Sequence, residues 1–166
     1  MTLVDRARVF ATAAHAAVGQ LRKYTFEPYI VHPQEVAGIV AEVDGTAEMI
    51  AAAWLHDTVE DTGVTIELIR AEFGQEVAEL VGWLTDVSRP DHGNRAQRKA
   101  VDRAHTAAAP AAAQTIKLAD LIANTRSIVQ HDPKFAATYL EEKRQLLEVM
   151  TKGDSRLRER ALAQIG

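Results

Sequence analysis

Apolar residues recur along most of this chain at the three- and four-residue spacing of an amphipathic helix. No segment shows the regular alternation that is typical of a half-buried strand. Proline, glycine and helix-capping residues divide the pattern into separate stretches. The sequence therefore predicts helices over residues 3–21, 33–43, 47–59, 65–73, 74–85, 94–109, 111–129, 133–150 and 155–165.

The predicted fold is all-α, a bundle of about eight to nine helices. The 166 residues are enough for one domain with a hydrophobic core, so we expect a single domain over residues 1–166. Aromatic residues make up only 5% of the chain, while alanine is abundant, which favours closely packed helices. The most apolar of the predicted helices, residues 47–59, is expected to be central.

Composition narrows the possible functions. Apolar residues make up 47% of the chain and charged residues 25%, as in ordinary soluble proteins. There is no cysteine, so any metal must be held by His, Asp or Glu. We find no membrane-spanning stretch and no secretory leader, and we expect a cytoplasmic protein. The net charge of −4 argues against nucleic acid as a partner. A polyanionic ligand would need a local basic patch.

The strongest chemical signal is the adjacent pair His56-Asp57, followed by Glu60 and Asp61. An imidazole nitrogen beside a carboxylate can bind a divalent cation and activate its water. If the helix 47–59 continues, Glu60 and Asp61 lie on the same face about one turn further on. Two carboxylates at a helix C-terminus oppose the helix dipole, so a nearby cation or a functional role would offset that cost.

Two more candidate ligands lie elsewhere in the chain. His32 precedes Pro33 at a predicted helix start, and Asp120 sits in an apolar helix, where a lone carboxylate is costly unless it is paired or bound to a metal. Each residue alone is read more simply as a hydrogen-bonded core residue. Together with His56 and Asp57, they would make an octahedral site with positions open to water.

The basic residues have two readings. Arg22-Lys23 follows the first helix, where cations are favourable, and is also a candidate anion site. Arg95, Arg98, Lys99 and Arg103 recur at helical spacing, which is more often a solvated face. Lys143-Arg144 is a weaker candidate. The remaining histidines, His15, His92, His105 and His131, are read as packing, surface or capping residues.

With these motifs in order, the chain resembles the HD-domain small alarmone hydrolases, relatives of the hydrolase domain of Rel/SpoT enzymes. The resemblance covers about residues 14–129. It rests on the segments Gln20-Leu21-Arg22-Lys23, Tyr29-Ile30-Val31-His32-Pro33, Leu55-His56-Asp57-Thr58-Val59-Glu60-Asp61, Phe73-Gly74, Leu84-Thr85-Asp86 and Lys117-Leu118-Ala119-Asp120 with Asn124.

The resemblance implies an HD-domain helical bundle that releases pyrophosphate from the ribose 3′ position of (p)ppGpp or a related alarmone such as (p)ppApp. It implies Mn²⁺, or another divalent cation, and catalysis by Glu60 and Asp61. Without the synthetase region of the long relatives, the chain is expected only to degrade. The implied metal ligands are His32, His56, Asp57 and Asp120, and the implied substrate-binding residues are Arg22, Lys23, Lys117 and Asn124, with Arg98 and Lys99 from the basic cluster.

Two other functions stay open from sequence. Another HD phosphohydrolase, such as an NADPH 2′-phosphatase or a 5′-nucleotidase, would share the metal residues. A non-catalytic nucleotide-binding module would keep the metal without needing Glu60 and Asp61. The segment Leu121-Ile122-Ala123 after Asp120 differs from the better-known relatives, so the choice of base is open, as is a homodimer.

Overall fold

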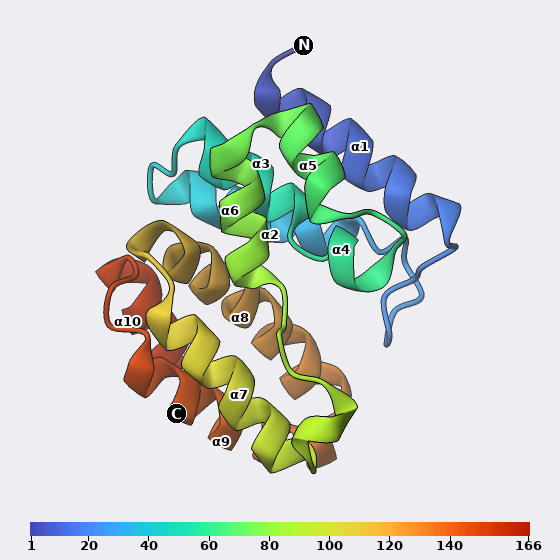
Figure 1. Cartoon of the computed structure of the whole chain (residues 1–166). Coiled ribbons are helices and arrows are strands. Elements are labelled where there is room, and N and C mark those ends of the chain that lie inside the picture. The colour runs from blue at the N-terminus through green and yellow to red at the C-terminus, as the bar shows by residue number, and fades with distance from the viewer. The chain divides into compact units, whose positions relative to one another are not determined.

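The computed structural model describes all residues from Met1 to Gly166 and contains only helices, turns and loops. The all-α prediction is confirmed. Contacts divide the chain into two compact units, Met1–Thr85 and Asp86–Gly166. The first unit is drawn from blue to green in Figure 1, and the second from yellow-green to red. No helix is both long enough and apolar enough to cross a membrane.

The first unit is built around one alanine-rich helix. Its helices are α1 (Leu3–Ala17), α2 (Val31–Glu42), α3 (Ala47–Leu55), α4 (Thr58–Asp61), α5 (Ile66–Phe73) and α6 (Gln75–Leu84). Helix α3 contacts α1, α2 and α6, and residues 51–55 of α3 are all buried (Figure 1). Three consecutive alanines in that stretch let the neighbouring helices approach closely. As predicted, the most apolar segment is central, within this unit.

The second unit is built around the longest helix. It contains a 3₁₀ turn (Pro90–His92), α7 (Arg95–Ala108), α8 (Ala111–His131), α9 (Pro133–Val149) and α10 (Ser155–Ala163). Helix α8 packs against α9 and α10, and α7 packs against α9 (Figure 1). Asp132 caps α9 through the backbone amide of Phe135, as its position before Pro133 predicts.

The prediction of one helix over residues 47–59 is wrong. Helix α3 ends at Leu55, and Thr58 begins the separate four-residue helix α4. Two side chains take carbonyls that a continuous helix would use: His56 Nδ1 donates to Ala53 O (2.6 Å), and Thr58 Oγ1 donates to Leu55 O (2.7 Å). The structure has nine α-helices of eight or more residues, in agreement with the predicted eight to nine, and the four-residue helix α4 besides. Glu60 and Asp61 do not lie at the end of the long apolar helix.

Two boundaries near the candidate site also differ from prediction. Helix α1 stops at Ala17 rather than residue 21, because Gly19 turns the chain with a φ of 65°. Helix α2 starts at Val31, so His32 lies inside its first turn. Pro33 is accepted there because amides of the first turn have no intrahelical partner.

Candidate functional site

The break between α3 and α4 falls at His56 and Asp57, which belong to neither helix. His56 is the C-terminal cap of α3, and Asp57 is the N-terminal cap of α4. The His56 side chain is buried, at 2% exposure, whereas Asp57 is partly accessible. A local backbone irregularity thus aims two adjacent side chains into one space.

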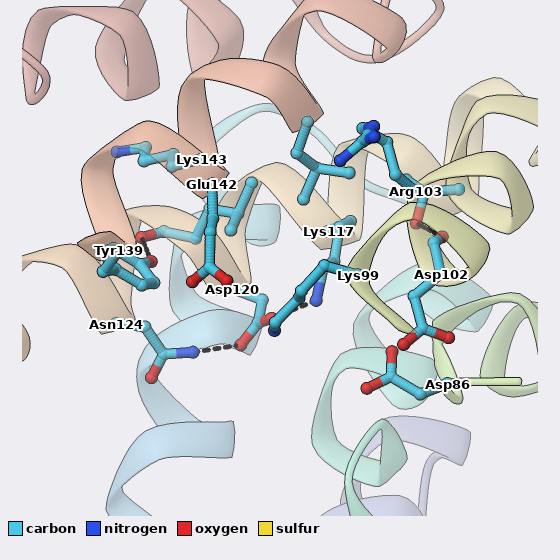
Figure 2. Close-up of a pocket in the computed structure, with 13 residues that line it drawn as sticks. Asp86, Lys99, Asp102, Arg103, Lys117, Asp120, Asn124, Tyr139, Glu142 and Lys143 are labelled. Carbon is cyan, nitrogen blue, oxygen red and sulfur yellow. Dashed lines mark hydrogen bonds and ion pairs between the residues drawn. The ribbon is translucent and has the colours of Figure 1, made fainter. Parts of the chain in front are cut away.

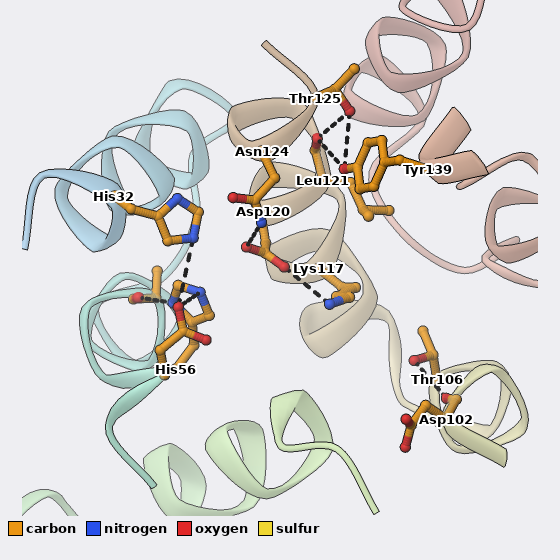
Figure 3. Close-up of polar contacts among 12 residues, drawn as sticks. His32, His56, Asp102, Thr106, Lys117, Asp120, Leu121, Asn124, Thr125 and Tyr139 are labelled. Atoms are coloured by element: carbon orange, nitrogen blue, oxygen red, sulfur yellow. Dashed lines mark hydrogen bonds and ion pairs between the residues drawn. The ribbon is translucent and has the colours of Figure 1, made fainter. Parts of the chain in front are cut away.

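His32 joins this pair from α2. Its Nε2 lies 3.7 Å from Asp57 Oδ2, and His56 Nε2 lies 3.0 Å from the same oxygen. One ligand atom from each of the three residues lies within 4.8 Å of the other two. Figure 3 shows the two imidazole rings next to each other; their planes are inclined by 65°, and the ring centroids are 5.3 Å apart. Three of the four predicted metal ligands therefore converge within the first unit.

The protonation pattern of His56 fits a bound cation. A backbone carbonyl only accepts hydrogen bonds, so Nδ1 must carry the proton that it donates to Ala53 O. In the neutral ring, Nε2 then presents its lone pair toward the carboxylate oxygen 3.0 Å away. Two lone pairs that face each other repel unless a proton or a cation lies between them. Fixing one ring nitrogen to a backbone carbonyl is also the usual way of orienting a metal-binding histidine.

Tyr29 is a site residue that sequence reasoning missed. Its hydroxyl donates to Asp57 Oδ2 at 2.6 Å, and its ring packs against His15 and His32, with centroid distances of 4.8 and 5.9 Å. Tyr29 therefore fixes the orientation of the carboxylate that both site histidines face. Tyr29 lies three residues before His32, on the segment that leads into α2, and this closeness to a candidate ligand could have identified it from the sequence.

Glu60 and Asp61 follow on the short helix α4, and both remain accessible to solvent. Partial burial raises the pKa of the Asp61 carboxyl above its ordinary value, and the nearby Asp57 charge raises it further. A hydrogen bond from Gln20 Nε2 to Asp61 Oδ2 (3.1 Å) acts in the opposite direction. Asp61 is thus a carboxylate held near the candidate metal cluster and open to an incoming molecule.

The two predicted phosphate-binding cations of the first unit differ in placement. They lie in the loop between α1 and α2, which is closed by a bridge between Leu21 and Pro28. The Arg22 guanidinium lies 5.9 Å from the centroid of the Tyr29 ring, beside the site. Lys23 instead lies over the ring of Tyr24, with its Nζ at 5.4 Å. The structure brings Arg22, but not Lys23, to a residue that contacts Asp57.

Asp120, the fourth predicted ligand, belongs to the second unit and lines a cavity of about 180 Å³ there. Its Oδ2 accepts from Lys117 Nζ at 3.0 Å, and its Oδ1 accepts from Asn124 Nδ2 at 2.9 Å (Figures 2 and 3). Spacings of three and four residues on α8 put these side chains on one face. The structure thus gathers three predicted residues into one network.

Some of the other residues that line this cavity were predicted as substrate-binding candidates, and some were not. Of the predicted basic cluster, Lys99 and Arg103 line this cavity, whereas Arg98 is not among its lining residues. Asp86 also lines it, and burial raises the pKa of its carboxyl above the ordinary value. Sequence reasoning did not select Asp86, although it belongs to the Leu84-Thr85-Asp86 motif.

Two further cavity residues come from α9. Burial raises the pKa of Tyr139 to about 12 and lowers the pKa of Lys143 to about 8. Lys143 Nζ donates to Thr125 Oγ1 (2.9 Å) and to Gln164 Oε1 (2.6 Å). Reading Lys143-Arg144 as one pair of cations missed this difference. The positions of Lys143 and Leu147, one turn apart on the buried face of α9, were the signal.

Comparison with known proteins gives a consistent picture. The family model described as "HD domain" matches residues 7–149. A protein of Synechocystis named probable guanosine-3′,5′-bis(diphosphate) 3′-pyrophosphohydrolase is 38% identical over 135 residues, which are 80% of this chain and 17% of that protein. A Mycobacterium leprae protein named probable GTP pyrophosphokinase is 38% identical over 151 residues, which are 90% of this chain and 18% of that protein. The chain therefore spans less than a fifth of the length of these two relatives.

Smaller proteins also match. The Xenopus tropicalis protein named guanosine-3′,5′-bis(diphosphate) 3′-pyrophosphohydrolase MESH1 is 37% identical over 109 residues, which are 64% of this chain and 59% of that protein. A solved structure described as a metazoan ortholog of SpoT that hydrolyzes ppGpp superposes with a TM-score of 0.86. That match covers 99% of this chain and 94% of the other at 24% identity, which establishes the fold.

Proposed function

We propose that this chain, which belongs to the HD domain family, is a metal-dependent hydrolase that releases pyrophosphate from the 3′ position of (p)ppGpp or a related alarmone. The convergence of His32, His56 and Asp57 carries the proposal, because two imidazole Nε2 atoms face one carboxylate oxygen. The names of the Synechocystis and Xenopus tropicalis relatives supply the substrate class.

The three clustered residues would hold the cation, for which we propose Mn²⁺. When bound, such a cation lowers the pKa of its water and neutralises charge that develops on phosphoryl oxygens. Asp120 as a fourth ligand stays a prediction from the resemblance, and a single domain over residues 1–166 stays a prediction from chain length. The family match over residues 7–149 includes parts of both units and supports the single-domain prediction.

Glu60 and Asp61 would accept or orient the proton of the attacking water. Asp61 suits this role because it is solvent-accessible and its pKa is raised by partial burial, toward the range in which a carboxylate accepts a proton readily. Their position on α4, directly after Asp57, keeps both carboxylates near the candidate cluster without making them part of it.

Six residues are proposed to bind the substrate. Arg22 and Arg98 would pair with a phosphate bidentately, as guanidinium groups do, and the lysines would act as point charges. Local positive charge of this kind reconciles a polyanionic substrate with a net charge of −4. Asn124 would contact the ribose. The other proposed contacts, which stay predictions, are Lys23, Lys99, Lys117 and Arg98.

Location and partners also stay predictions. We predict a cytoplasmic location, a possible homodimer, and no nucleic-acid or membrane partner.

The direct test incubates the Mn²⁺-loaded protein with ppGpp and identifies the products. We expect GDP and pyrophosphate. Inorganic phosphate as the only product, or no turnover of any 3′-substituted nucleotide, contradicts the proposal. Parallel assays with ppApp, NADPH and nucleoside 5′-monophosphates identify the base and separate the proposed activity from the other HD phosphohydrolase reactions.

Conservative variants of the two carboxylates test their role. Glu60→Gln and Asp61→Asn should each lower kcat by about a hundredfold or more, the usual scale for a lost general base, while Mn²⁺ affinity stays unchanged. Glu67→Gln, at an exposed position on α5, is the matched control. Full turnover in both Glu60→Gln and Asp61→Asn would show that neither carboxylate is the general base. Nucleotide binding without turnover in the wild type, unchanged in both variants, would favour a non-catalytic nucleotide-binding module.

A further inference from the structure

His15 is a buried polar residue for which the proposed mechanism has no use. It lies on the core-facing side of α1, one turn beyond Ala11, and its side chain is 1% exposed. Its Nδ1 lies 2.8 Å from Gln20 Oε1, while its Nε2 is buried without a hydrogen-bond partner. A buried ring nitrogen without a hydrogen-bond partner costs free energy. The hydrogen bond between Nδ1 and Gln20 is therefore expected to offset that cost.

Hydrogen-bond chemistry gives this contact one direction. The Gln20 amide also reaches Asp61, with Nε2 to Oδ2 at 3.1 Å. An ionised carboxylate only accepts, so the amide must turn its NH₂ group to Asp61 and its oxygen to His15. That oxygen in turn requires a proton on His15 Nδ1. The three side chains therefore form a directed chain, from His15 through Gln20 to Asp61.

The backbone holds Gln20 in this bridging position. After α1, Gly19 turns the chain, and the Gln20 amide N–H donates to His15 O at 3.1 Å. The Gln20 carbonyl accepts from the amide of Tyr29 at 3.1 Å. Both backbone groups of Gln20 are thus satisfied locally, which leaves its side chain to link α1 to α4.

The same histidine also supports the other carboxylate of the site. The His15 ring packs against the Tyr29 ring, and the Tyr29 hydroxyl donates to Asp57. His15 is therefore in contact with the two residues, Gln20 and Tyr29, that orient Asp61 and Asp57. Packing alone would not require a polar ring at this buried position.

We propose that Gln20 is a positioning residue for Asp61, and that His15 fixes the amide of Gln20 in the orientation that this role needs. The inference rests on the proposed hydrolase function. Gln20 touches neither the candidate metal ligands nor, in this role, the substrate, so it acts through Asp61. Its loss should lower kcat and leave both KM and Mn²⁺ affinity unchanged.

A double-mutant cycle tests the coupling. Gln20→Leu, which keeps the volume but removes the amide, should lower kcat by about tenfold or more, as is usual for partners that orient active-site groups. In the Asp61→Asn background, the same change should lower kcat no further, because the interaction is already altered. His15→Phe, which keeps an aromatic ring against Tyr29, should lower kcat in the wild type but not in the Gln20→Leu background. Gln34→Leu, at an exposed position on α2, is the control.

Nuclear magnetic resonance tests the inference without turnover, and its first part uses the wild-type protein alone. The ¹⁵N chemical shifts of neutral His15 should report a protonated Nδ1 and an unprotonated Nε2, and Asp61→Asn should shift the side-chain amide signals of Gln20. A protonated Nε2 in the neutral ring overturns the inference. So does a Gln20→Leu effect of the same size with and without Asp61. Absence of wild-type turnover instead overturns the proposed function, and the shifts still decide whether the chain of hydrogen bonds exists.

Discussion

The two units of this protein place an aspartate in opposite electrostatic situations. In the first unit, Asp57 faces the Nε2 atoms of two buried histidines, which carry a charge only when they are protonated. In the second unit, Asp120 accepts hydrogen bonds within its own helix from the Lys117 ammonium at 3.0 Å and the Asn124 amide at 2.9 Å. A bound metal cation would stabilise the first arrangement, whereas the second already contains the Lys117 ammonium.

Because of this contrast, the two carboxylates should contribute differently to the free energy of metal binding. A cation that enters the first cluster relieves the repulsion between the His56 Nε2 lone pair and the Asp57 carboxylate. A cation that binds Asp120 meets a carboxylate whose two oxygens already accept from Lys117 and Asn124. We therefore expect most of the free energy of metal binding to come from the first unit. Four experiments test this expectation and the wider contrast between the units.

The largest effect is expected from removing a histidine of the first unit. His56→Ala should lower Mn²⁺ affinity and turnover by more than about a hundredfold, because one of the three converging donors is lost. Calorimetric titration with Mn²⁺ and the ppGpp assay measure the two quantities. His131→Ala, at an exposed position that ends α8, is the control. Unchanged Mn²⁺ affinity in His56→Ala would mean that the cluster is not the metal site.

The histidine cluster also shows how far sequence reaches. His56 and Asp57 were predicted as ligands from their adjacency, and the structure does bring them together with His32. The helix break that aims them was not predictable, because no glycine or proline marks it and the apolar pattern continues to Val59. The break depends on side-chain bonds to the carbonyls of Ala53 and Leu55, which a periodicity argument does not count.

Partners far apart in sequence were the other limit. The helices of the second unit were predicted well, because Pro110 and the Asp132-Pro133 pair mark their ends. In contrast, the bond from Tyr29 to Asp57 joins residues 28 positions apart, and the bond from Gln20 to Asp61 joins residues 41 apart. No local spacing encodes such pairs, so the motif residues were visible in the sequence while the bonds between them were not.

Asp120 gives the next test of the contrast. If Asp120 completes the metal site, Asp120→Asn should lower Mn²⁺ affinity by about ten- to a hundredfold, because the amide cannot replace a carboxylate ligand. Lys117→Met, which frees an oxygen of Asp120 from its ammonium partner, should raise Mn²⁺ affinity or leave it unchanged. Equal Mn²⁺ affinity in Asp120→Asn and the wild type would leave Asp120 as the counter-ion of Lys117 only.

Lys143 tests the cost of a charge buried in the second unit. Burial lowers its pKa to about 8 in the folded state, so the unfolded chain binds more protons between that value and the ordinary pKa of 10.5. The free energy of unfolding should therefore rise with pH, by about 2 kcal/mol between about pH 7 and about pH 9.5. Tyr139, with its pKa raised to about 12, opposes this trend only above about pH 10.

Urea unfolding across this pH range measures the trend. Lys143→Met should flatten it, because no ammonium remains to be discharged. Lys152→Met, at an exposed lysine of the same unit, should keep the wild-type slope. A pH slope that survives in Lys143→Met would show that the trend arises from other groups.

The smallest effect concerns backbone strain, which again separates the units. Both non-glycine residues with positive φ, Phe26 at 60° and Asp44 at 59°, lie in the first unit. Aspartate tolerates this conformation, but a bulky aromatic does not, and the Phe26 side chain is 73% exposed, so packing offsets little of the cost. Phe26→Asn should therefore raise the free energy of unfolding by up to about 1 kcal/mol, measured by urea denaturation. Phe26→Ala keeps the strain and should gain little. Equal gains in both variants would trace the cost to exposed apolar surface instead of the strained turn beside Arg22.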